Sequence, residues 1–94
     1  MVQFFHSNDG IHKYVAVFDD GEQVAFGAIG YDDFITSGGD TRKKKNYLAR
    51  HKKREDWNDP RTPGALSRWI LWGPTTNIEE NIKRFKRKFN MHLE

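Results

Sequence analysis

The signals for β-strands and the signals for helices occupy separate parts of this chain, and that separation restricts the folds open to it. Residues 1–36 hold short runs rich in β-branched and aromatic residues, divided by clusters of turn formers. From residue 41 to about 55 there is no Gly or Pro, and the many Lys and Arg residues favour a helix. Strands followed by helices are typical of an α+β fold. We predict one small domain over residues 1–94: a three-stranded antiparallel meander, mainly in residues 1–36, followed by about three helices packed on it, mainly in residues 41–90.

The strongest turn signal is Asp20-Gly21, because these residue types tolerate the positive φ that a tight hairpin turn needs. It separates one strand at residues 13–18 from another at residues 23–27. If the two residues form the whole loop, the register places four apolar side chains on one face, with Val17 opposite Val24 and Val15 opposite Phe26. We expect that face to pack on the core.

The segment after the strands is irregular up to a flexible joint at residues 37–40. We expect Tyr31 and Phe34 to pack this crossing segment onto the edge of the sheet. The first helix then covers residues 41 to about 55 and ends before Pro60, since the residue before a proline avoids helical backbone angles. Its inner stripe is narrow and consists of Tyr47, Leu48 and His51.

Two further helices have clear start signals. Thr62-Pro63 provides an N-cap and a first helical residue, and residues 64–72 are apolar on most sides. Residues 76–79 have the spacing of a capping box, and an amphipathic stripe follows at Ile78, Ile82, Phe85 and Phe89. We expect the core of these two helices to contain Trp69, Ile70, Ile82, Phe85 and Phe89.

The composition excludes several classes of protein. Without Cys, the chain has no disulfide framework, no thiolate metal site and no cysteine nucleophile. Aromatic residues make up 14% of the chain, which argues against disorder. No apolar run approaches the roughly 18 residues of a membrane span, and the N-terminus lacks the basic start of a signal peptide. We therefore expect a soluble protein that is not secreted.

No constellation of residues points to a reaction. The four His residues have no pair at the spacing of metal ligands on one helix, so we expect no metal site. The glycine-rich stretches match neither a P-loop nor a dinucleotide-binding fingerprint. The adjacent acids Asp32-Asp33 and Glu79-Glu80 point in different directions and do not form an acid–base pair. We predict a protein that is not an enzyme and needs no cofactor.

The charge is distributed unevenly. Residues 1–40 carry one base against seven acids, a net charge of −6, and residues 41–94 carry fifteen bases against six acids, a net charge of +9. Such asymmetry is compatible with a polyanionic partner, with an internal match between the two parts, or with head-to-tail self-association of copies.

Eight bases lie between residues 42 and 54, and they are the sharpest functional signal. A helix this basic can neutralise several phosphates, whereas nothing in the sequence indicates readout of base edges. We predict a nucleic-acid-binding surface formed by Arg42, Lys43, Lys44, Lys45, Arg50, Lys52, Lys53, Arg54, Lys86 and Lys88. The alternative is a solvated face, a docking surface for an acidic protein, or a nuclear import signal. Trp57 and Arg68 are candidates for a partner interface, since Trp and Arg dominate interface hot spots.

Several strings are distinctive, above all Tyr47-Leu48-Ala49-Arg50-His51 and Ser67-Arg68-Trp69-Ile70-Leu71-Trp72. Together with residues 30–34 and 55–60, they resemble a small single-domain family encoded by large DNA viruses of algae and amoebae, of the phycodnavirus and mimivirus type. The resemblance covers residues 13–90, although residues 35–39 are looser than the charged linker usual in that family. The family has no assigned function, so no catalytic residues are carried over.

The resemblance implies a viral source and a stand-alone domain. Combined with the basic segment, it predicts a component of the virion or nucleoid that contacts DNA phosphates without sequence specificity. The alternative is a minor capsid or scaffold-like protein that binds an acidic viral protein, and a third option is a host-interaction factor directed to the nucleus. The expected location is the virion or the host nucleus or cytoplasm.

Overall fold

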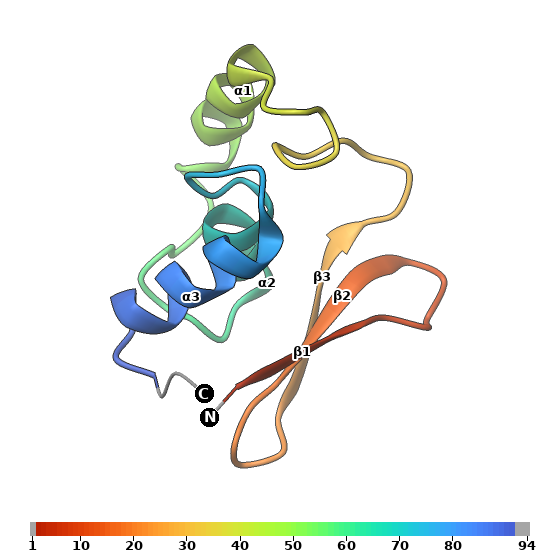
Figure 1. Ribbon diagram of the computed structural model, residues 1–94, viewed down its shortest axis with the longest axis vertical. Coiled ribbons are helices and arrows are strands. Elements are labelled where there is room, and N and C mark those ends of the chain that lie inside the picture. Colours follow the sequence, from red (N-terminus) through yellow and green to blue (C-terminus); the bar gives the residue numbers. More distant parts are fainter. Residues whose placement is uncertain (1, 92–94) are drawn as a thin grey trace.

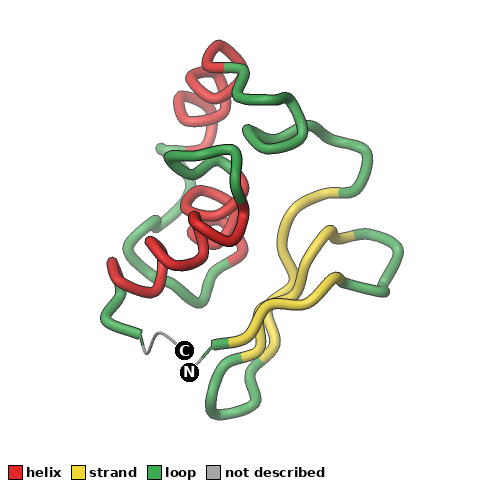
Figure 2. The backbone as a smooth tube through the Cα atoms, viewed as in Figure 1, coloured by secondary structure: helices red, strands yellow, loops and turns green. Residues whose placement is uncertain are grey.

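The computed structural model describes residues 2–91, in which a three-stranded sheet has the helices within residues 63–88 packed against one of its faces, and the helix at residues 41–51 lies beyond its edge (Figure 1). The strands are β1 (Gln3–His6), β2 (His12–Val17) and β3 (Gln23–Ala28), antiparallel and in the order β1-β2-β3. The helices are α1 (Thr41–His51), α2 (Pro63–Leu66), the single π-helical turn η1 (Ser67–Leu71), and α3 (Ile78–Lys88). The predicted α+β fold is confirmed, and strands and helices form separate layers (Figure 2).

The register of the β2–β3 hairpin differs from the prediction by one residue. Val15 pairs with Ala25 and Ala16 with Val24, so the buried face carries Ala16, Phe18, Val24 and Phe26. The loop has three residues, because the amide of Phe18 donates to the carbonyl of Glu22, and Gly21 has φ +89°. A turn followed by a glycine of positive φ is the usual three-residue hairpin loop. The positive φ of Gly21 was therefore predicted correctly, but the expected packing of Val15 and Val17 on the core was wrong.

One hydrophobic cluster joins the sheet to the helices. Its buried members are Val2, Ala16, Phe18, Val24, Phe26, Tyr47, Leu66, Ile70, Leu71, Trp72 and Phe85. Of the five side chains predicted for the core, Ile70 and Phe85 are buried, whereas Trp69, Ile82 and Phe89 are half-buried at the margin of the cluster. Helix α3 meets the cluster through the middle of its apolar stripe, so Ile82 and Phe89 are only partly covered, whereas Trp69 lies on η1 with Arg68 and Lys88 over its ring.

Each of the three α-helices is capped by a short polar side chain. Asp40 accepts a hydrogen bond from the amide of Lys43 at the start of α1, and Thr62 accepts one from Ala65 at the start of α2, as predicted for Thr62. At α3 the N-cap is Asn77, which binds the amide of Glu80, so the predicted capping box is displaced by one residue. Helix α1 ends at His51 rather than near residue 55.

The crossing segment between β3 and α1 is fixed by backbone contacts. The amide of Phe34 donates to the carbonyl of Leu71, and Phe34 is half-buried. The expectation for Tyr31 was wrong, because its side chain is 74% exposed. Asp33 holds this segment instead, as described below. Within the described residues, no helix has the length and apolarity needed to cross a membrane.

Candidate functional site

A cleft of about 210 Å³ lies where α1, η1 and α3 meet, and we call it the basic cleft. Four cationic side chains line it, together with two aromatic rings and a proline: Lys44, Arg68, Arg84 and Lys88, with Trp69, Phe85 and Pro74. Among the described residues none of the lining side chains is acidic. The basic cleft therefore concentrates positive charge beside apolar walls.

Arg68 is a half-buried cation of the basic cleft. It lies on the π-helical turn, which the amide of Trp72 closes by donating to the carbonyl of Ser67 at 2.9 Å. The guanidinium Nη1 donates to the carbonyl of Trp72 at 2.9 Å, and the guanidinium carbon lies 4.3 Å from the centre of the Trp69 ring and 5.3 Å from that of Trp57. Burial lowers the pKa of Arg68 below its usual range.

The Arg68 side chain is short of acceptors. Its Nε is buried and has no hydrogen-bond partner within residues 2–91. A buried donor without a partner costs about 1–3 kcal/mol in a typical protein. No carboxylate lines the basic cleft to compensate this group, so an anion entering there would meet an uncompensated cation.

Lys44 adds a second half-buried cation. Its Nζ donates to the carbonyl of Gly73 at 2.8 Å and lies 4.5 Å from the centre of the Phe34 ring. Burial lowers the pKa of Lys44, and the positive charge of Arg68 lowers it further. The two cations thus repel each other across the basic cleft. Lys44 was not predicted for the inner stripe of this helix, but it is half-buried on the same side of α1 as Tyr47.

Helix α3 supplies the remaining two charges. The Nζ of Lys88 lies 4.3 Å from the centre of the Trp69 ring. Arg84, one turn earlier on the same face, donates from Nε to Glu80 at 3.0 Å. Phe85 lies next to Arg84 in sequence and belongs to the core, so its burial positions both bases at the rim of the cleft.

The other bases predicted for the surface lie outside the basic cleft. Seven of them are exposed on α1 or on the turn that follows it: Arg42, Lys43, Lys45, Arg50, Lys52, Lys53 and Arg54. Lys43 forms an ion pair with Asp32. Lys86 is half-buried on α3. The structure thus brings together Lys44 and Lys88 of the predicted surface and Arg68 of the predicted interface.

Sequence reasoning missed three features of this site. Arg84 was not singled out, although its spacing of four residues from Lys88 places both on one side of a helix. Trp69 was assigned to the core but forms a wall of the basic cleft, with its Nε1 donating to the carbonyl of Trp57 at 2.8 Å. Trp57 itself is half-buried and donates from Nε1 to Glu55 at 3.0 Å.

Several acids of the first 40 residues are matched inside the molecule. Arg61 contacts both Asp20 and Glu22, at 2.9 and 2.7 Å. Together with the Lys43–Asp32 pair, these contacts link the acidic part of the chain to the basic part. An internal match between the two parts, one of three options left open by the sequence, therefore exists within the described residues. Of the four cations that line the basic cleft, Arg84 pairs with Glu80, and no ion pair with the acidic part of the chain involves the other three within the described residues.

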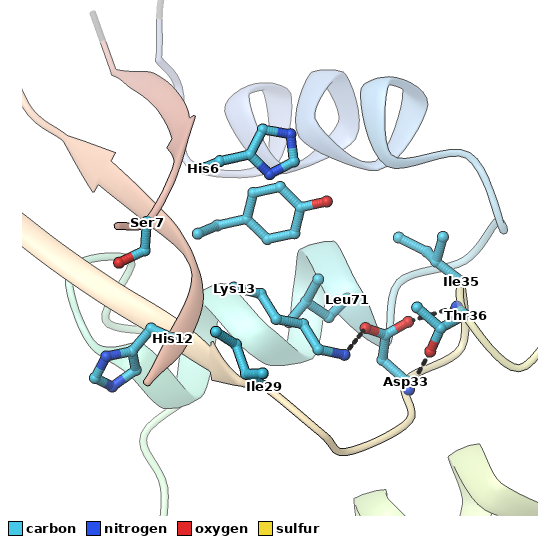
Figure 3. A pocket seen from close by; sticks show the side chains of 10 residues that line it. His6, Ser7, His12, Lys13, Ile29, Asp33, Ile35, Thr36 and Leu71 are labelled. Carbon is cyan, nitrogen blue, oxygen red and sulfur yellow. Dashed lines mark hydrogen bonds and ion pairs between the residues drawn. The ribbon is translucent and has the colours of Figure 1, made fainter. Parts of the chain in front are cut away.

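A second cavity, of about 340 Å³, lies between the sheet and the crossing segment (Figure 3). Its charged groups Lys13 and Asp33 pair with each other. The Lys13 Nζ points toward Asp33 and contacts it at 2.8 Å, and Asp33 exchanges hydrogen bonds with the backbone and side chain of Thr36 at 2.8 and 2.9 Å (Figure 3). Asp33 is 2% exposed. This pair anchors the crossing segment rather than offering free groups to a ligand.

The largest cavity, of about 480 Å³, lies between β3, α1 and α2. His51 contacts Glu55 there at 3.0 Å and stacks on Tyr47, which in turn stacks on Trp72. Burial, aided by the charge of Glu55, raises the pKa of Tyr47 well above its usual range, so this phenol stays neutral. Both acidic and basic side chains line this cavity, in contrast to the single sign of charge in the basic cleft.

The chain was also compared with known proteins. A protein-family model described as a family of unknown function (DUF5754) matches residues 2–51. The matched part contains the whole sheet, the crossing segment and α1, and it includes Lys44 but none of the other lining residues of the basic cleft. No curated protein and no solved structure matches the chain.

Proposed function

The chain belongs to DUF5754, a family of unknown function, and we propose that it is a non-enzymatic nucleic-acid-binding protein that contacts phosphates through its basic helices. The observation that carries the proposal is the basic cleft, where four cations line one cavity without an acidic neighbour among the described lining residues. Cations held in this way favour a bound anion, since a partly buried like-charge cluster is relieved by an opposite charge.

The exposed bases around the basic cleft extend the same surface. Those on α1 and the following turn have the length and charge to reach successive phosphates of a backbone. Binding by such groups does not depend on base sequence, because phosphate contacts carry no sequence information directly. The half-buried Trp69 offers little to bases, since Arg68 and Lys88 already lie against its ring.

The biological setting proposed here is the virion or nucleoid of a large DNA virus. It is supported by the resemblance of the strings at residues 47–51 and 67–72 to the viral family. The alternative role is a minor capsid or scaffold-like protein whose basic surface binds an acidic protein.

The proposal is tested by measuring binding to duplex DNA of arbitrary sequence by fluorescence anisotropy at increasing salt. Affinity should fall steeply, with a slope of log K against log salt of about −0.9 per phosphate contacted. The triple variant Lys45→Gln/Lys52→Gln/Lys53→Gln removes three exposed bases and should flatten the slope by about one per lost contact. The matched control, with the same three residues changed to Arg, keeps the charge and should keep the slope.

If the wild-type protein binds neither duplex nor single-stranded nucleic acid at low salt, the proposal is wrong. The basic surface would then be a docking site for an acidic protein, and the capsid or scaffold role would take precedence. Equal loss of affinity in the Gln and Arg triple variants would also contradict the proposal, because it would show that charge is not the determinant.

A further inference from the structure

We propose that the basic cleft is a receptor for a single terminal phosphate, a phosphate monoester, and that in the nucleic acid it binds the phosphate at a 5′ end. The inference rests on the proposed function and deepens it. The exposed bases of α1 follow a backbone, whereas the basic cleft is a single site in which cations from three different elements converge.

The size of the basic cleft favours a small anion. Its volume of about 210 Å³ is below the roughly 300–1,000 Å³ of pockets that hold drug-sized molecules. A phosphate group fits such a space, and the sugar and base of the nucleotide can remain outside it. A phosphodiester within a strand is linked to two sugars, and both must leave the cleft. A terminal phosphate is linked to only one.

The charge of the basic cleft favours a monoester over a diester. A monoester carries a charge of about −1.5 to −2 at pH 7 and three terminal oxygens, whereas a backbone phosphate carries a single charge. Four cations line the cleft, and the two half-buried ones, Lys44 and Arg68, face no carboxylate there. The monoester, which carries the larger charge, therefore gains more electrostatic binding free energy at this site than a diester does.

Hydrogen-bond capacity points the same way. Within residues 2–91 the Arg68 guanidinium makes a single hydrogen bond, from Nη1 to the carbonyl of Trp72. The planar guanidinium has five N–H groups, and it binds phosphate oxygens in pairs. The stacking of Arg68 between Trp57 and Trp69 fixes its orientation in advance, which reduces the entropy lost on binding.

The experiment compares two single-stranded oligonucleotides of identical sequence, one with a 5′-phosphate and one with a 5′-hydroxyl, each labelled at the 3′ end. At equal salt the wild-type protein should bind the phosphorylated strand about tenfold more tightly, the effect of one additional charge-assisted contact. Inorganic phosphate should compete with the 5′-phosphate for the basic cleft and so reduce the preference for the phosphorylated strand. Closed circular duplex DNA, which has no ends, measures backbone binding separately.

Two matched variants of α3 locate the preference. Lys88→Gln removes a cation that lines the basic cleft, and Lys83→Gln removes an equally exposed cation of the same helix that does not line it. Lys88→Gln should abolish most of the preference for the 5′-phosphate, and Lys83→Gln should keep it. Arg68→Lys, which retains the charge but loses the planar fork, should also reduce the preference. Arg68 is half-buried, so this variant can fail to fold. In that case the comparison of Lys88→Gln with Lys83→Gln tests the assignment to the basic cleft.

Equal affinity for the two strands, with closed circles still bound, overturns the phosphate receptor and leaves the proposed function in place. A preference for the 5′-phosphate without binding to closed circles supports the receptor and refutes the backbone surface. Tighter binding of a phosphoserine peptide than of the 5′-phosphorylated strand overturns the nucleic-acid end as the source of the phosphate. Loss of the preference in both Lys variants alike overturns the assignment to the basic cleft.

Discussion

At the scale of single residues, Gly27 determines how closely η1 lies on the sheet. A Cβ atom built on Gly27 would lie 2.6 Å from Cδ1 of Leu71, and the residue has φ +78°. We expect Gly27→Ala to lower the free energy of unfolding by about 2–4 kcal/mol, from overpacking and from the left-handed backbone. Gly21→Ala is the control, because its φ is +89° but nothing lies within 4 Å of its Cβ position. Urea denaturation of both variants checks the difference, and equal losses would show that the contact with Leu71 does not restrict the sheet.

The buried pair Lys13–Asp33 is a second feature at this scale. The side chain of Asp33 is 3% exposed and that of Lys13 18% exposed. Lys13→Met should lower the free energy of unfolding by about 3–5 kcal/mol, because it leaves a buried carboxylate without its partner. The double variant Lys13→Met/Asp33→Asn removes that charge and keeps an oxygen that can accept from the amide of Thr36, so it should recover most of the loss. Additive losses in this cycle, followed by chemical denaturation, would contradict an interaction between the two residues.

At the scale of elements, α3 contacts the core mainly through one turn. Phe85 is 1% exposed, whereas Phe89 lies half-buried at the margin with its ring centre 5.0 Å from that of Phe85. We expect Phe85→Ala to lower the free energy of unfolding by about 3–5 kcal/mol and Phe89→Ala by clearly less. Thermal unfolding followed by circular dichroism measures both. Equal losses in the two variants would mean that the whole apolar stripe of α3, and not one turn of it, contributes to packing on the core.

The turns contain acids that link stability to pH. Backbone N–H groups of His12 and Ile11 lower the pKa of Asp9, Arg61 lowers that of Asp20, and Lys43 lowers that of Asp32. A pKa lower in the folded state than in the unfolded state means that the folded state favours the ionised form. The stabilisation is therefore complete above the unfolded value, near pH 3.9, and is lost as the pH falls through the lower folded values.

We accordingly expect the melting temperature to fall as the pH is lowered from about 5 to 2. Asp9→Asn/Asp20→Asn/Asp32→Asn should melt lower than wild type at pH 6, and its melting temperature should change less over this range. A parallel decline of the two proteins would show that other acids control the acid sensitivity.

The elements could be predicted from the sequence, but the register of the hairpin could not. Both faces of β2 are apolar, one with Val15 and Val17 and the other with Tyr14, Ala16 and Phe18, so alternation does not choose between them. The length of the hairpin loop decides which face of β2 packs on the core, and Asp20-Gly21 fits a two-residue or a three-residue loop equally well. Because side chains alternate along a strand, a slip of one residue turned the other face of β2 toward the core, while Val24 and Phe26 of β3 are buried as expected.

The candidate site was predictable only in part, for a similar reason. The basic segment of α1 is visible in the sequence because its charges are contiguous. The basic cleft is assembled from residues that lie far apart, such as Lys44, Arg68 and Arg84, and only the packing of η1 and α3 brings them together. The inward position of Lys44 follows from its three-residue spacing to Tyr47, a signal that the surrounding lysines concealed.

At the scale of the whole molecule, the end of the family match falls inside a continuous core. Residues 2–51 contribute six members of the buried cluster, and the other five come from residues 66–85, in α2, η1, α3 and the residue that follows η1. We expect a fragment of residues 1–51 to lack cooperative unfolding, because the inner face of its sheet would be exposed to water. Circular dichroism with thermal melting tests this, with residues 1–94 as the control. A cooperative transition in the fragment would show that the matched segment folds independently.

The stack of Tyr47 on Trp72 has an optical consequence. The two rings lie 4.5 Å apart between their centres and 11° from parallel, and they join α1 to the residue that follows η1. Aromatic side chains held rigidly in an asymmetric environment give near-ultraviolet circular dichroism, which disappears when tertiary packing is lost. This signal, compared between wild type and Tyr47→Leu, therefore reports when α1 separates from the segment that contains Trp72, while the far-ultraviolet signal of the helix itself persists. The protein thus carries a built-in chromophore pair with which the undocking of its most basic helix can be followed without a label.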